Sequence, residues 1–218
     1  PSAPKTATGN DLLLNFTNAS IIDNTMKNNL ETVDDAQIDT SIKKFGTGSM
    51  QFDGTGDGLI LPNSPALVMG SGNWTIEFFM YYDNSSFTDY RTIIDQRNSA
   101  HDEIAIAIYF DGANSLDFYT DGGMKADIPT SSMSVRTWHH IALVKNGSTT
   151  KFYLDGTATG ASDTSDTRNY VVTGNTHIGE RYSNAQYFLG YLDDFRITKG
   201  VARYISDFTA PTKSFANR

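Results

Sequence analysis

Alternating apolar and polar positions divide most of the chain into short segments typical of β-strands. The clearest segment runs from Trp74 to Tyr82, where Ile76, Phe78 and Met80 share one face and Glu77 lies on the other. A side-chain period of two over a short run indicates a strand with one buried face. No stretch keeps a sustained helical period, so the pattern predicts an all-β protein.

Further strands are expected wherever apolar runs lie between turn residues. The expected ranges are 12–16, 49–52, 59–61, 91–95, 103–110, 115–120, 138–145, 150–154, 176–179 and 191–198. Turn dipeptides such as Asp111-Gly112 and Asn146-Gly147 separate many of them, and Asn-Gly between two alternating runs is a strong hairpin signal. The polar stretch from residue 17 to about Ser41 is expected to be a long, irregular loop.

Many short strands at spacings of about 8 to 12 residues predict a β-sandwich of two antiparallel sheets packed face to face. Residues 1–10 are small, polar and proline-containing, which is the composition of a linker. Residues 11–218 are expected to form a single domain, because all-β sandwiches of this length are often one unit.

The amino-acid composition limits the classes of molecule that the protein is expected to bind. The 25 acidic residues comprise 21 Asp and only four Glu, the net charge is -8, and cysteine is absent. Asp favours turns and supplies hard oxygen ligands for calcium. Nucleic-acid binding needs a basic patch, and membrane insertion needs roughly 20 consecutive apolar residues; the sequence shows neither.

Four stretches, in order along the chain, resemble the laminin G-like branch of the concanavalin A-like lectin/glucanase superfamily. They are FGTGSMQFDGTGDGLILP at 45–62, GSGNWTIEFFMYY at 70–82, WHHIALVKNGSTTKFYLDG at 138–156 and HIGERYSNAQYFLGYLDDFRI at 177–197. The resemblance implies a jelly roll of two curved antiparallel sheets. It also implies that a ligand binds on the concave sheet or at loops along one rim.

The sequence does not carry the catalytic groups of the enzymes in this superfamily. Laminarinase-type relatives place two catalytic Glu on one strand, whereas the four Glu here stand far apart at positions 31, 77, 103 and 180. A nucleophile elbow and a zinc-protease motif are both absent. The resemblance further implies that Trp138 packs in the core and that His140 is structural. We therefore expect that the protein is not an enzyme.

A structural calcium ion is expected from the resemblance. Asp193 would bind it together with the carbonyl of Gly48 and residues near Asn15, because calcium takes six to eight oxygen ligands, main-chain ones included. In the alternative interpretation Asp193 caps a turn. Asp194 is expected to face solvent on the opposite side of the strand.

A second oxygen-rich turn holds Asp53 and Asp57 among glycines. It could bind another ion or be an ordinary Asp-Gly turn, and it lacks the spacing of an EF-hand. A pentraxin-type double calcium site is not expected, because only Glu180 remains of the Glu-Gln-Asp cluster found there in pentraxins.

Two loops, 96–103 and 181–187, combine aromatic, amide and charged side chains that the core does not need. Such groups stack on sugars and hydrogen-bond their hydroxyls, although both loops could instead be solvated connections. The predicted ligand-binding residues are Arg97, Asn98, His101, Arg181, Tyr182, Asn184 and Tyr187.

The sequence thus predicts a non-catalytic recognition module that binds a glycan or surface polysaccharide, within a larger extracellular, cell-surface or virion protein. The alternative is a structural or assembly domain of a phage tail, capsid or surface array, which has only protein contacts and an oligomer or assembly partner. An enzyme of unrecognised mechanism would need two convergent carboxylates in a cleft.

Overall fold

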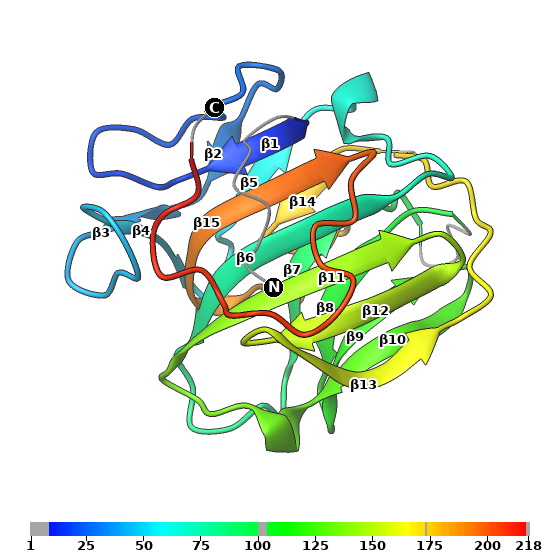
Figure 1. Cartoon of the computed structure of the whole chain (residues 1–218). Coiled ribbons are helices and arrows are strands. Elements are labelled where there is room, and N and C mark those ends of the chain that lie inside the picture. The colour runs from blue at the N-terminus through cyan, green and yellow to red at the C-terminus, as the bar shows by residue number, and fades with distance from the viewer. Residues whose placement is uncertain (1–8, 100–103, 173, 217–218) are drawn as a thin grey trace.

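The computed structural model describes residues 9–99, 104–172 and 174–216, which fold as two antiparallel sheets packed face to face (Figure 1). The eight-stranded sheet has the order β13 (Thr157–Asp163), β12 (Thr149–Leu154), β11 (Trp138–Asn146), β6 (Trp74–Tyr82), β15 (Leu189–Lys199), β4 (Ser49–Asp53) and β3 (Gln37–Asp39), with β1 (Asn10–Leu14) also pairing with β15. The predicted β-sandwich is confirmed.

The seven-stranded sheet has the order β10 (Gly123–Pro129), β9 (Ser115–Thr120), β8 (Ala107–Asp111), β7 (Tyr90–Asp95), β14 (Thr176–Ile178), β5 (Gly58–Leu61) and β2 (Glu31–Val33). Two 3-10 helices, η1 (Pro65–Leu67) and η2 (Thr130–Ser132), lie in connections. Residues 1–8 of the expected linker lie outside the described residues, and Asn10 already belongs to β1.

The main core lies between the two sheets and follows the alternation read from the sequence. In β6, Ile76, Phe78 and Met80 point inward and are fully buried. Phe78 stacks on Phe195 of the neighbouring strand β15, with ring centroids 5.3 Å apart. Burying such side chains contributes about 25 cal/mol per Å² of apolar surface, so this face of each sheet is fixed by its sequence.

Four observed strands were not expected. The supposed loop up to Ser41 contains β2 and β3, so that expectation was wrong; both strands have three residues and lie at sheet edges. Strands β10 and β13 were also missed, and β13 is a polar, mostly exposed edge strand. Strands β2, β3 and β13 bury little and therefore have a weak hydrophobic pattern. Strand β10, in contrast, buries Ala126 and Ile128 in the main core, so its alternation could have been recognised.

The C-terminal tail covers the outer face of the eight-stranded sheet, crossing several of its strands (red in Figure 1). Tyr204 and Phe208 stack with ring centroids 3.6 Å apart, and both pack against Tyr153 of β12. Further along, Phe215 packs on Phe79 of β6. The tail therefore adds a second apolar layer on this outer face.

Trp138 belongs to this outer layer. It begins β11, an interior strand as expected, but it is half-buried and packs against Tyr81 and the small cluster formed by Leu13, Phe79 and Phe215. The expectation that it packs in the core is met only by this small outer cluster, since Trp138 is half-buried and lies outside the main core between the sheets. The fully buried tryptophan of the main core is Trp74.

Candidate ligand-binding site

The outer face of the seven-stranded sheet carries a group of tyrosines. Strands β8 and β9 pair so that Tyr109 lies opposite Asp117 and Ala107 lies opposite Tyr119. Because the inward positions of these strands hold Ile108, Phe110, Leu116 and Phe118, the alternate positions point away from the core. The C-terminal tail lies on the other sheet, so it does not cover these side chains.

Arg97 is the centre of this group. It follows β7, and its guanidinium forms a bidentate pair with Asp95, from Nε at 2.9 Å and Nη2 at 2.8 Å. The same guanidinium lies over the rings of Tyr119, Tyr182 and Tyr109, at 5.1, 5.6 and 5.8 Å from their centroids. Arg97 is 4% exposed, so it acts as a fixed support that sets the positions of three half-buried rings.

The turn after β14 brings the third tyrosine to this position. Arg181 donates its main-chain N–H to the carbonyl of Ala185 and accepts, at its own carbonyl, from the N–H of Asn184, both at 2.9 Å. The Arg181 guanidinium lies 5.0 Å from the Tyr182 ring centroid. Tyr182 therefore lies close to two arginines, Arg97 and Arg181, that come from different loops.

Both Asp117 and Tyr109, neighbours on this face, have raised pKa values. Burial, as the largest cause, and the charges of Asp111 and Asp127 raise the pKa of Asp117 to about 6, although the Ser115 hydroxyl donates to it at 2.6 Å. Burial and then the charge of Asp117 raise the pKa of Tyr109 to about 12. The Tyr109 hydroxyl is thus neutral at physiological pH and can both donate and accept a hydrogen bond.

Strand β14 continues the polar row across the sheet. His177 pairs with Asp95 of β7, and its Nδ1 lies 2.9 Å from Oε1 of the buried Glu180. Asp95 opposes Ala107 on the next strand, and Ala107 opposes Tyr119. The short Ala107 side chain leaves room above the sheet where the Arg97 guanidinium reaches from Asp95 to the tyrosines.

The structure brings together three of the predicted ligand residues, namely Arg97, Arg181 and Tyr182. Asn98 and Asn184 are exposed on the two adjoining loops. Tyr187 is half-buried, and its carbonyl accepts from Arg91 at 2.8 Å. His101 lies outside the described residues.

Sequence reasoning missed Tyr109 and Tyr119. Both occupy outward positions of strands whose inward positions are apolar, so an aromatic residue there has no role in the core. That pattern, repeated on two strands joined by the Asp111-Gly112 turn, was a usable signal for an exposed aromatic surface.

A hollow of about 500 Å³ opens elsewhere, at the end of the sandwich beside η2. Its lining includes Ser86, Phe87, Ala113, Met133 and Val135. These side chains are small or apolar, and none of the predicted ligand residues lines this hollow.

Asp193, the expected calcium ligand, accepts three main-chain hydrogen bonds. Its Oδ2 accepts from the N–H groups of Lys44 and Phe45, at 3.1 and 2.9 Å, and its Oδ1 accepts from Asp194 at 2.8 Å. Burial, the largest cause, and the charge of Asp194 raise its pKa to about 7 against the lowering effect of these bonds. This is the geometry of the turn-capping alternative, and calcium binding here with Gly48 and Asn15 stays a prediction.

Asp194 does not face solvent as expected. It is fully buried in a β-bulge of β15, with φ of +48°, and its carboxylate accepts from Asn15 at 2.6 Å, Ser214 at 2.8 Å and the main chain of Phe215. The bulge breaks the alternation on which the expectation rested. Asp194 instead links the C-terminal tail to Asn15, the residue after β1.

These observations define a two-sheet β-sandwich in which the C-terminal tail packs on the outer face of one sheet and a group of tyrosines lies on the outer face of the other. The chain belongs to the concanavalin A-like lectin/glucanases superfamily, whose family model matches residues 53–202. The family-level resemblance read from the sequence is thereby confirmed. None of the curated proteins matches the sequence.

Three solved structures illustrate the similarity of fold. The binding domain of Paraclostridial Mosquitocidal Protein 1 is 18% identical with a TM-score of 0.66, covering 88% of this chain and 49% of that one. The botulinum neurotoxin serotype D ligand-binding domain in complex with N-acetylneuraminic acid is 13% identical with a TM-score of 0.65, covering 96% and 48%. The chain therefore spans about half the length of these toxin domains.

The third structure matches along nearly its whole length. Domain 4 of AbnA, an extracellular arabinanase from Geobacillus stearothermophilus, in complex with arabinotriose, is 17% identical with a TM-score of 0.66, covering 89% of this chain and 94% of that one. At such identities the likeness establishes the fold. Among the described residues, no helix has the length and apolar character needed to span a membrane.

Proposed function

We propose that the protein is a non-catalytic glycan-binding module whose ligand lies on the outer face of the seven-stranded sheet. The observation that carries this proposal is the group of three half-buried tyrosines, Tyr109, Tyr119 and Tyr182, held around the buried Arg97. Because Arg97 fixes the rings, they would hold their binding positions before a sugar arrives.

The chemistry of this face suits a sugar. Aromatic rings offer flat apolar surfaces to the C–H faces of a pyranose or furanose, and fixed polar groups select its hydroxyls. Asp117, the tyrosine hydroxyls, Asn98 and Arg181 supply acceptors and donors around the rings. Ordering the rings in advance reduces the entropy lost on binding.

The solved structures support this assignment at the level of analogy. Two of the domains with this fold are described in complex with N-acetylneuraminic acid or arabinotriose, and they come from a toxin and an extracellular enzyme. We therefore propose that the module belongs to a protein that acts outside the cell, on a cell surface or on a virion. The absence of the superfamily's paired catalytic Glu supports a binding role.

A glycan array with and without EDTA, followed by calorimetry on the best ligand, tests the proposal. Tyr119→Ala and Tyr182→Ala should each weaken binding about tenfold or more, which corresponds to roughly 1.4 kcal/mol. The matched control is Tyr81→Ala, which removes a half-buried tyrosine from the outer face of the other sheet.

Absence of binding to any glycan under either condition would overturn the proposal. Equal loss of affinity in the Tyr81 and Tyr119 variants would also count against it, because that result would indicate general destabilisation. Symmetric oligomers with no sugar affinity, seen by light scattering, would instead favour an assembly domain.

A further inference from the structure

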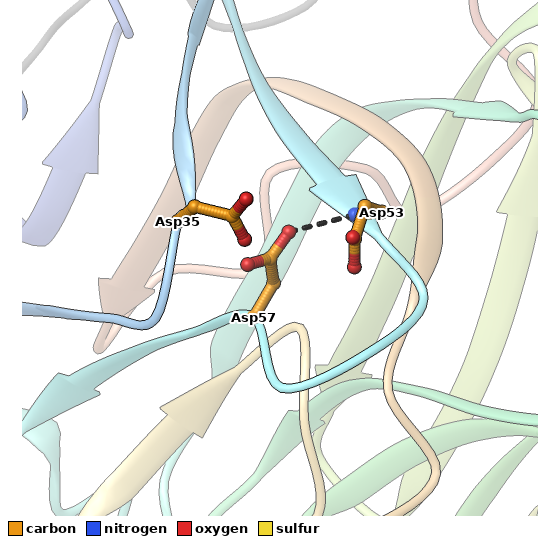
Figure 2. Close-up of side chains that lie close together, drawn as sticks. All are labelled: Asp35, Asp53 and Asp57. Carbon is orange, nitrogen blue, oxygen red and sulfur yellow. Dashed lines mark hydrogen bonds between the residues drawn. The ribbon is translucent and has the colours of Figure 1, made fainter.

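Three carboxylates from two neighbouring turns meet at one edge of the sandwich. Asp35 belongs to the turn between β2 and β3, while Asp53 ends β4 and Asp57 precedes β5. One oxygen from each carboxylate lies within 4.8 Å of the others, and Figure 2 shows the Asp57 carboxylate between the other two. Each of the two turns carries the chain from one sheet to the other.

Asp57 contributes a buried carboxylate, one oxygen of which has no hydrogen-bond partner among the described residues. Its Oδ2 accepts the main-chain N–H of Asp53 at 2.7 Å, which closes the glycine-rich turn. Its Oδ1 is buried and has no hydrogen-bond partner among the described residues, in a side chain belonging to a residue only 2% exposed. A buried carboxylate oxygen without a partner is costly, so it requires a ligand, a proton or a water molecule.

The cluster has no compensating cation among the described residues. None of the three carboxylates forms an ion pair there, and the nearby Arg91 is directed to the carbonyls of Gly54 and Tyr187 and to Asp89. The negative charge of the three carboxylates is therefore not balanced by a cation among the described residues.

From this geometry we infer that Asp35, Asp53 and Asp57 bind one calcium ion, which joins the β2–β3 turn to the β4–β5 turn. Calcium–oxygen distances of about 2.3–2.6 Å allow ligands on opposite sides of the ion to lie nearly 5 Å apart. The observed spacing of the three oxygens fits that span. Calcium also accepts irregular sets of carboxylate, carbonyl and water ligands, whereas magnesium demands a near-ideal octahedron.

The lack of a side chain at Gly56 lets a further carboxylate approach the turn. Gly56 has φ of +83°, and a Cβ atom there would lie 2.1 Å from Oδ2 of Asp34, so a fourth carboxylate lies against the same turn. Asp53 and Asp35 are exposed, which leaves the outer side of the cluster open to water ligands. The buried Asp57 would form the floor of the site and the exposed acids its rim.

An ordinary Asp-Gly turn explains only part of this arrangement. The turn itself needs Asp53, whose Oδ1 accepts from Thr55 at 2.7 Å, and the Asp57 bond to Asp53. It does not need Asp35, which comes from a different crossover and adds a like charge. Repulsion between unshielded carboxylates would push the two turns apart, whereas a shared cation would hold them together.

Calcium titration of the full chain by calorimetry, after removal of metals with a chelator, tests the inference. We expect one calcium ion per chain, with a dissociation constant on the order of 10⁻⁴ M, as in extracellular calcium sites of modest charge. Asp57→Asn and Asp35→Asn should each weaken binding about tenfold or more. The matched control, Asp121→Asn, removes the same charge from another Asp-Gly turn and should leave the affinity unchanged.

Two outcomes of this experiment would overturn the inference. Absence of calcium binding up to about 10 mM, well above the expected range, would show that the acids share a proton instead. Undiminished binding in Asp35→Asn would place the ion elsewhere, for example at Asp193. Should Asp57→Asn fail to fold, the exposed Asp35 carries the test alone, and neither result depends on glycan binding.

Discussion

Arg196 donates two hydrogen bonds, from Nε at 2.9 Å and Nη2 at 2.7 Å, to a single carboxylate oxygen of Glu77. The two residues oppose each other on β15 and β6, in the outer face of the eight-stranded sheet. The other oxygen of Glu77 accepts from the hydroxyl of Tyr204 at 2.7 Å and lies 3.3 Å from Nε2 of His140. A fully buried charge pair thus ties the C-terminal tail to the sheet.

Burial alone would raise the pKa of Glu77, but Arg196 beside it, with His140 and Tyr204, lowers that pKa to about 2. The carboxylate therefore stays ionised throughout the ordinary pH range. Its stabilising role is present above the unfolded pKa near 4.5 and is lost only as the pH falls toward 2.

Glu77→Gln should lower the free energy of unfolding by about 3–5 kcal/mol, because it leaves Arg196 buried without its counter-charge. Urea denaturation followed by tryptophan fluorescence measures the change. Arg136→Ala is the control, since its ion pair with Asp83 is exposed and contributes at most about 1 kcal/mol. Equal losses in the two variants would contradict the structural role given to Glu77.

Asp117 should make stability depend on pH in the opposite direction. Its folded pKa, about 6, lies above its ordinary value of 3.8, so its contribution is fully present below pH 3.8 and is lost as the pH rises through 6. Relative to Asp117→Asn, the wild type should lose roughly 1–3 kcal/mol between pH 4 and pH 8. Parallel stability curves for the two proteins would refute the raised pKa.

Gly179→Ala should be strongly destabilising because the residue has φ of +86° and an added Cβ would lie 2.2 Å from Cε1 of Phe52. Gly147, with φ of +59° and open space around it, is the control. Gly147→Ala should cost about 1–2 kcal/mol for its left-handed conformation, and Gly179→Ala about 1–3 kcal/mol more for overpacking. Chemical denaturation compares them, and equal costs would show that Phe52 yields freely.

The strands predicted from the sequence bury one face, and three of the four missed strands, β2, β3 and β13, bury little. Strand β10 was missed although it buries Ala126 and Ile128. Trp74 to Tyr82 was predicted with its observed bounds because its alternation reflects burial against the second sheet. Strand β13 could not be recognised, because its residues are exposed and its pairing partner β12 lies on one side only. Hydrogen bonding alone leaves little trace in the amino-acid sequence.

The candidate sites were predictable to the extent that loops carry unusual side chains. Arg97 and Tyr182 were selected in that way, and the structure places them in contact across about 85 residues of chain. Asp35 could not have been selected, because nothing in the sequence relates it to Asp53 and Asp57. Their proximity follows from two sheet-to-sheet crossovers lying side by side, which is a property of the topology.

The bulge at Asp194 shifts the alternation of inward and outward side chains in β15 by one residue. Leu192 faces the core before it, and Phe195 and Ile197 face the core after it, so the inward positions change from even to odd numbers. Removing one residue here would turn Phe195 outward and bring Arg196 and Thr198 between the sheets. We therefore expect an insertion or deletion at Asp193 or Asp194 to disrupt the strand more than a substitution there.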